Sequence, residues 1–406
     1  MVKKRDDDAR RGNGPAGDFD DFEHFDDSAE EQDDDLAADW ADLDEEDGEE
    51  PADAESVLLD DLDGKDDDPV AAARAELSVA ELLRRLISDP QEVHLRDLFA
   101  LSDLSRADMA VVEESWPQIP AVRRRTVLAG LLESVNTYLQ LQLGRLLRIA
   151  LHDDDDEVRR LAVTGLWEDQ ESDLIGVFAQ LLANDPSSAV RAAAAAGLGS
   201  YVLAGELEEL DAPLAMRAEE ALLAAIHNQE EALEVHCRAL ESLAFSSETG
   251  LRQLIEDAYY SPFEEMRLSA MRAMGRSADT RWRSFARTEL DSPSPAMRAE
   301  AAIACGDLDA QKARKQLMAL LADEEQDVRL AAIYALGHLG GKDVRSALSA
   351  IAQGDDEDEA EAAELALEEM LFYDEVGAAS LLAEDDEAGP DADDEPWWDR
   401  EDDEDE

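Results

Sequence analysis

Apolar residues follow one pattern that recurs along the chain about every 31 residues. In each recurrence an arginine is followed by apolar residues at offsets of three, four and seven, which is one face of an α-helix. We call the place of this arginine the marker position. The marker residues are Arg123, Arg159, Arg191, His236, Arg267, Arg298, Arg329 and Glu361, the first and last being degenerate. The pattern therefore predicts one amphipathic marker helix in each repeat.

The third residue after the central markers is alanine in every repeat. These residues are Ala162, Ala194, Ala239, Ala270, Ala301 and Ala332. We interpret this column as a place where neighbouring helices approach too closely for a larger side chain. Gly275, Gly306 and Gly337 follow the apolar face, and we expect them to cap the ends of the marker helices.

A second apolar segment lies between successive marker helices, for example at residues 172–183 and 313–322. Asp, Ser and Pro residues precede each marker helix and suit its N-terminal cap. Each repeat is thus predicted to be a helix–turn–helix unit. Units of this length stack on their neighbours, so the predicted fold is an all-α solenoid.

The two ends of the chain differ from this middle in charge. Of the formal charge of −66, residues 1–68 contribute 30 Asp and Glu against 6 Lys and Arg, and residues 384–406 contribute 15 against 1. Such segments bury too little apolar surface to fold. We therefore expect disordered acidic tails at 1–75 and 377–406, around a solenoid at 76–376. The interval from Arg191 to His236 is 45 residues, which predicts an inserted loop at 202–215.

The repeated motif resembles a known family. The segments DEEQDVRLAAIYALG (323–337) and DPSSAVRAAAAAGLG (185–199) are similar to bacterial HEAT-like repeats of the phycobilisome-lyase type. The resemblance covers roughly residues 100–373 and implies stacked antiparallel helix pairs. Because this repeat serves in bilin lyases, in regulators and in scaffolds, it implies no single activity.

No catalytic, cofactor-binding or metal-ligating residue is predicted. Deoxyhypusine hydroxylases, which share the fold, use His-Glu dipeptides, and none of the six histidines here is followed by Glu. The zinc, phosphate-loop and nucleophile motifs are also lacking, and the calcium-like segment at 59–70 fails at both essential ends. Cys237 and Cys305 lie in helical repeats, where we expect buried thiols. With no signal or membrane-spanning segment in the sequence, we expect a cytoplasmic protein.

The negative charge also bears on partners, because nucleic acids and anionic membranes recruit clustered Lys and Arg. We therefore expect neither as a partner. The column of marker arginines has two interpretations. Each guanidinium could pair with an acid on the neighbouring turn, such as Asp153–Asp156, Glu264 or Glu265, or the column could form a row that reads phosphates.

A basic and aromatic segment interrupts the acidity and is a candidate docking patch for a partner or a tail. Its residues are Arg267, Arg272, Arg276, Arg281, Trp282, Arg283, Phe285, Arg287 and Arg298. Both tails carry aromatic residues between acids, which suit docking onto such a patch, although a purely solubilising role is the alternative. The candidate docking residues are Phe19, Phe22, Phe25, Trp40, Trp397 and Trp398.

These observations favour a non-enzymatic scaffold or adaptor. A protein partner would bind the concave solenoid surface, and the acidic tails would modulate that binding, including through contact with the solenoid. The alternative is a bilin-lyase-like enzyme built on the same repeats, and a nucleic-acid-binding solenoid is a remote third. The sequence does not identify the partner.

Overall fold

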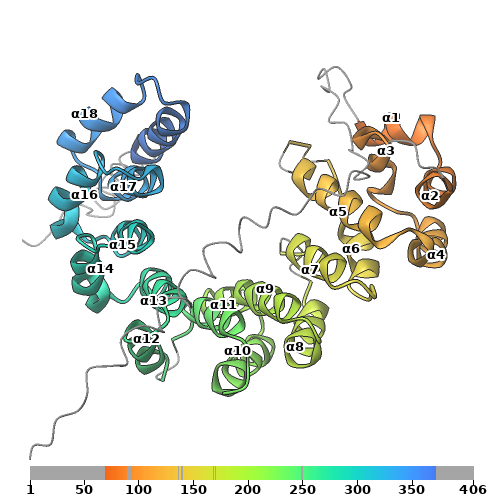
Figure 1. Cartoon of the computed structure of the whole chain (residues 1–406), viewed down its shortest axis with the longest axis horizontal. Helices are drawn as coiled ribbons and strands as arrows, with labels where there is room; N and C mark the ends of the chain where they lie inside the picture. Colours follow the sequence, from red (N-terminus) through yellow and green to blue (C-terminus); the bar gives the residue numbers. More distant parts are fainter. Residues whose placement is uncertain are drawn as a thin grey trace, which may run out of the picture. The chain divides into compact units, whose positions relative to one another are not determined.

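The computed structural model describes residues 69–371, apart from 89–92, 136, 139, 168, 170 and 248–249. All regular elements in this part are helices, which confirms the predicted all-α fold (Figure 1). Their bounds are α1 Pro69–Glu76, α2 Val79–Ser88, α3 Leu95–Leu98, α4 Arg106–Ser115, α5 Ala121–Val135, α6 Gly144–Ala150, α7 Asp156–Gly165, α8 Asp173–Asn184, α9 Ser188–Glu206, α10 Ala212–His227, α11 Leu233–Leu243, α12 Leu251–Tyr259, α13 Glu264–Arg276, α14 Arg283–Glu289, α15 Pro295–Asp307, α16 Arg314–Leu320, α17 Gln326–Leu339 and α18 Lys342–Ile351. A further helical segment covers residues 357–371.

The helices pack as two layers that follow the repeat. The odd-numbered helices from α5 to α17 are the marker helices, and each contacts the next. The even-numbered helices from α6 to α18 pack against them, for example α8 on α9, α12 on α13 and α16 on α17. The stack of helix pairs predicted from the 31-residue period is therefore confirmed.

The alanine column lies in the centre of this stack. All six alanines at three residues after the marker have no exposed surface. The residues seven after the marker, such as Leu198 and Leu336, are buried as well. A continuous apolar core thus runs from unit to unit, as the offsets of three, four and seven predict.

The prediction that Gly275, Gly306 and Gly337 cap their helices was wrong. All three lie inside α13, α15 and α17, and their φ angles are negative. Instead, each marks a close approach to the next marker helix. A Cβ atom on Gly306 would lie 2.9 Å from the Cα of Ala335, and one on Gly337 would lie 2.8 Å from the Cβ of Ala366. These glycines therefore set how closely the marker helices pack.

In each of the two end units, the marker position lies one residue away from the predicted one. In the first, Arg124 rather than Arg123 occupies the marker position, since Arg124 is 3% exposed and Val127 follows it into the core. In the last, the contact between Gly337 and Ala366 places the marker at Ala360 rather than Glu361.

The insertion does not form the predicted loop at 202–215. It lengthens two consecutive helices, so that α9 has 19 residues and α10 has 16, joined by residues 207–211. Val202 and Ala215 are buried against the stack, which explains why these residues stay helical.

The helical region also begins earlier than the predicted boundary at residue 76. Helix α1 starts at Pro69, and its Ala73 is 2% exposed. The predicted tails lie outside the described residues, except for the part of the N-terminal one that forms α1.

The close contact at Gly306 gives a test of the packing. Gly306→Ala should force α15 and α17 apart and destabilise the protein by about 1–3 kcal/mol, the usual cost of overpacking. The measurement is urea unfolding followed by circular dichroism. Gly250→Ala is the control, because a Cβ there meets nothing within 4 Å. Equal unfolding midpoints for the two variants would contradict the close-packing role.

Candidate interaction surface

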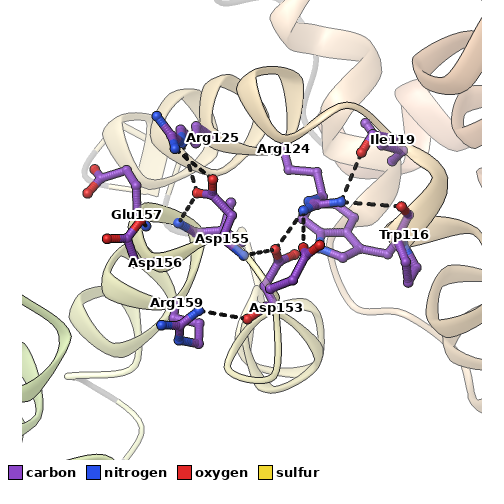
Figure 2. Close-up of polar contacts among 12 residues, drawn as sticks. Trp116, Ile119, Arg124, Arg125, Asp153, Asp155, Asp156, Glu157 and Arg159 are labelled. Carbon is purple, nitrogen blue, oxygen red and sulfur yellow. Dashed lines mark hydrogen bonds and ion pairs between the residues drawn. The ribbon is translucent and has the colours of Figure 1, made fainter. Parts of the chain in front are cut away.

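The marker arginines join each unit to the next, and Figure 2 shows the first of these joints. Nη1 of Arg124 donates to the carbonyl of Ile119 at 2.9 Å, in the turn that precedes its own helix. Nη2 donates to Asp153 at 2.7 Å and to Asp154 at 2.5 Å, in the turn of the next unit. The Trp116 indole N–H also donates to Asp153, at 2.7 Å. One guanidinium therefore holds two successive turns.

The same geometry continues along the stack. Nη1 of Arg159 donates to the carbonyl of Asp153 at 2.9 Å, and Nε and Nη2 donate to the Asp185 carboxylate at 2.8 and 2.9 Å. Equivalent joints are Arg191 with Glu231, Arg298 with Asp323 and Arg329 with Glu359. The predicted ladder is confirmed at these joints, and its arginines are occupied by carboxylates rather than available as a phosphate-reading row.

The ladder changes in the middle of the stack. Arg267 donates to the carbonyl of Ser261 at 3.0 Å, yet in the described part of the chain it forms no ion pair. The reason is that Ser292 stands where other units carry the accepting acid. Glu264 and Glu265, predicted as ladder acids, do not accept from a marker arginine, and Glu264 instead accepts from Ser294 at 2.6 Å.

A second network joins these units instead, through side chains in the middle of the marker helices rather than in the turns. Glu241 of α11 is 2% exposed and accepts from Ser269 at 2.7 Å and Arg272 at 3.1 Å, both on α13. Arg272 in turn donates to Glu300 of α15 at 2.7 Å. Burial alone would raise the pKa of Glu241, but the Ser269 hydroxyl and the arginine charges outweigh it and lower the pKa below its ordinary value.

The predicted basic patch is divided among three places, because side chains that are near in sequence point in different directions. Arg267 and Arg298 belong to α13 and α15, and their guanidinium groups bind the turns of the ladder. Arg272 belongs to the Glu241 network, and Arg276 donates to the Glu241 carbonyl at 3.3 Å. Beyond α13, Arg281 pairs with Asp279, Arg283 donates to the Leu308 carbonyl, and Arg287 is half-buried on α14.

The aromatic residues of that segment are part of the core. Trp282 is 5% exposed and meets the half-buried Phe285 edge to face at 5.2 Å between ring centroids. The candidate docking residues Phe19, Phe22, Phe25, Trp40, Trp397 and Trp398 lie outside the described residues. Tail docking on the basic segment therefore stays a prediction, and the segment does not present one continuous basic and aromatic face.

Sequence reasoning missed an apolar stripe on the marker helices. Ile303, Tyr334 and Leu365 each lie five residues after their marker and 31 residues apart, and they are 36%, 40% and 60% exposed. We call these three residues the apolar stripe. The same place in α11 and α13 holds the charged Glu241 and Arg272. The exposed face therefore changes from charged to apolar along the stack.

A groove of about 640 Å³ lies between α15 and α17 and includes part of the stripe. It is lined by Pro295, Ala296, Ala299, Glu300, Ile303, Glu325, Asp327, Val328, Leu330, Ala331 and Tyr334. We call it the α15–α17 groove. Its three charged lining residues are all acids, and the other lining residues are apolar or aromatic. An apolar floor with an acidic rim is a surface that can bind another chain.

Comparison with known families identifies the repeat. The sequence profile of HEAT repeats matches residues 144–219 and 283–368. The chain contains HEAT repeats in these two segments. The two matches include both partners of the ladder joints at Arg159, Arg298 and Arg329. They also include the whole apolar stripe. No curated protein sequence gives a significant match.

Solved structures with a similar fold have low sequence identity to this HEAT-repeat protein. The CpcE–CpcF complex of phycocyanin lyase from Nostoc is 19% identical over 57% of this chain and 87% of that one, with a TM-score of 0.42. Human deoxyhypusine hydroxylase is 19% identical over 66% and 96%, with a TM-score of 0.30. Yeast importin-β is 12% identical over 75% and 47%, with a TM-score of 0.41. At these values no function is carried over.

The remaining groups with potential chemistry have structural positions in the HEAT-repeat stack. Cys237 and Cys305 are free and buried, as predicted, and burial raises the pKa of Cys305 to about 12. His236 hydrogen-bonds the Asn228 carbonyl at 2.9 Å, in the turn before its helix. Among the described helices, none has the length and apolar character needed to cross a bilayer.

The joint between Arg159 and Asp185 gives a test of the ladder. Asp185→Asn keeps the shape but removes the charge that faces a buried guanidinium, so we expect a loss of about 3 kcal/mol of local stability. The measurement is hydrogen exchange at pH 7, which should become faster in α7 and α9 and stay unchanged in α17. Glu157→Gln is the control, because its pair with Arg160 is exposed and contributes less than about 1 kcal/mol.

The same joint has a defined pH dependence. Burial would raise the pKa of Asp185, but hydrogen bonds from Arg159 and the Ser187 N–H outweigh it and lower the pKa below the ordinary value. A lowered pKa means that the carboxylate stabilises the folded state above about pH 4 and loses this effect as the pH falls below it. The difference in hydrogen exchange between the wild type and Asp185→Asn should therefore shrink below pH 4. A constant difference down to pH 2.5 would show that the charge is not its cause.

Proposed function

We propose that this HEAT-repeat protein is a non-enzymatic scaffold or adaptor that binds a partner protein on the exposed face of its C-terminal marker helices. The observation that carries this proposal is the apolar stripe. Ile303, Tyr334 and Leu365 recur in phase with the repeat, although a purely structural role would not require exposed apolar side chains at that place. Contiguous exposed apolar side chains with a polar rim are typical of protein-binding surfaces.

Tyr334, in the middle of the stripe, is held in place by its neighbours, which favours binding. The Tyr334 hydroxyl donates to Asp307 at 2.8 Å, and its ring packs on His338 with 4.4 Å between centroids. Ala299 and Ala331 lie near Ile303 and Tyr334 on the same two packed helices, α15 and α17. A side chain that is already ordered loses little conformational entropy when a partner covers it, so most of the buried apolar area contributes to affinity.

The chemical groups of the chain also support a binding role over an enzymatic one. A thiol whose pKa is about 12, as in Cys305, is protonated at neutral pH and is a poor nucleophile. The buried carboxylate of Glu241 is held charged by Arg238 and Arg272 and is poorly suited to act as a general base. Both groups stabilise the stack.

The proposal predicts that partner binding depends on the stripe. Ile303→Asp combined with Leu365→Asp should reduce the amount of a specific partner that copurifies from the native host at least about tenfold, because it places charges in the apolar contact. Quantitative mass spectrometry of affinity-purified full-length protein is the measurement, with circular dichroism to show that the helices are intact.

Leu207→Asp is the matched control, since Leu207 is 58% exposed in the turn between α9 and α10, outside the stripe. It should retain the partner. If the double variant and the control retain the same proteins in the same amounts as the wild type, the C-terminal face is not the binding surface and the proposal fails.

A further inference from the structure

We propose that the α15–α17 groove binds a basic amphipathic helix of the partner, with lysine or arginine at the acidic end and leucine-like side chains at the apolar end. This inference rests on the proposed function and specifies the chemistry of the bound segment. It is carried by the distribution of charge and apolar surface along the groove.

The acidic end lies at the start of α17. Glu325 and Asp327 are exposed, and neither forms an ion pair within the described part of the chain. The third acid, Glu300, already accepts from Arg272, so it has less capacity for a new cation. Two uncompensated carboxylates beside an apolar floor favour a cation from outside the chain.

The apolar end lies further along the same helices. Asp327 and Tyr334 are seven residues apart on α17, which is two helical turns, or about 10 Å. Ile303 on α15 lies at the level of Tyr334 in the repeat, since both are five residues after their markers. A helix lying along the groove would therefore place its basic residue about seven positions away from its aliphatic one.

The floor of the groove permits a helix to approach. Ala296, Ala299 and Ala331 line it, and small side chains let a neighbouring helix lie close. The groove has a volume of about 640 Å³, which gives room for several side chains of an inserted segment. It is open to solvent and would not enclose a small molecule as a binding pocket does. An amphipathic helix in a groove is a common mode of peptide recognition.

Two other occupants are disfavoured by charge. Residues 1–68 and 384–406 of this chain are strongly acidic, and a second copy would bring a net charge of −66. Glu325 and Asp327 would repel both. A basic partner gains from the same field that excludes these competitors.

The first test uses purified full-length protein and a fluorescent synthetic peptide of Leu, Ala and Lys. The peptide is 14 residues long, with Lys and Leu seven positions apart. Its two counterparts have the same composition in scrambled order and Glu in place of Lys. Fluorescence anisotropy should show that the patterned basic peptide binds at least about tenfold more tightly than either counterpart. Binding should weaken as salt screens the charges. Equal affinity for the acidic peptide would overturn the inference.

Variants of the groove separate its two ends. Glu325→Gln with Asp327→Asn should weaken peptide binding about fivefold at low salt and reduce its salt dependence. Ile303→Asp should abolish it. The control is Glu208→Gln with Glu209→Gln, which removes two exposed acids in the turn after α9 and should leave binding unchanged. An unchanged affinity in the Glu325 and Asp327 variant would also overturn the inference.

A second test identifies what occupies the groove in the host and distinguishes the two proposals. A photoreactive phenylalanine at position 334 of the full-length protein should cross-link to a partner segment that carries Lys or Arg about seven residues from Leu, Ile or Met. Cross-links to a neutral or acidic partner segment, or to this chain's own tails, would refute the basic helix. In the neutral or acidic case, loss of the cross-link in Ile303→Asp would still uphold the proposed function. A cross-linked partner that is unaffected by Ile303→Asp would count against both.

Discussion

The stack depends on one interaction, in which a guanidinium is shared between two successive turns. Arg159 illustrates it: one nitrogen closes the turn before its own helix through the carbonyl of Asp153, and the others bind the carboxylate of Asp185 in the next unit. Asp185 then accepts from Arg191 through its own carbonyl. Because each unit contacts only its neighbours, this joint fixes the spacing and rotation of the next unit wherever it forms. The planar, forked arginine side chain suits both tasks, which lysine could not perform together.

The joint also determines which surface positions are available for binding. Where Ser292 replaces the accepting acid, Glu241, Arg272 and Glu300 connect the marker helices along their lengths instead of through the turns. These units use the place five residues after the marker for stability. Arg298 and Arg329 form the joint again, with Asp323 in the turn before α17 and with Glu359 at the start of the helical segment 357–371. The same place then holds exposed side chains, Ile303, Leu365 and Tyr334, of which Tyr334 also hydrogen-bonds Asp307.

The period, the alanine column and the first ladder acids, Asp153 and Asp154, could be predicted from the sequence, because they follow the repeat, whereas the prediction of Glu264 and Glu265 was wrong. Gly306 could not be interpreted correctly, since glycine suits both a helix end and a close helix contact, and only the position of Ala335 decides between them. The first marker was misplaced because three consecutive arginines, from Arg123 to Arg125, offer three registers. The basic segment was divided by partners from other units, above all Glu241, which sequence distance does not reveal. The apolar stripe had a signal that could have been read: Ile303, Tyr334 and Leu365 are spaced by the period itself.

In the binding that we propose, net charge and local surface act on different stages. The charge of −66 acts over a distance of about a Debye length and favours encounters with basic partners, which is mainly an effect on association rate. It cannot select among them, because exposed ion pairs each contribute little to the final affinity. Discrimination among basic partners requires an apolar surface that only a partner of matching shape can bury. The α15–α17 groove beside Ile303 and Tyr334 is such a surface. The tails and the groove carry charge of the same sign, so the tails would discourage acidic competitors without having to occupy the groove. In this proposal, specificity therefore comes from the exposed apolar side chains of the marker helices rather than from the arginine ladder.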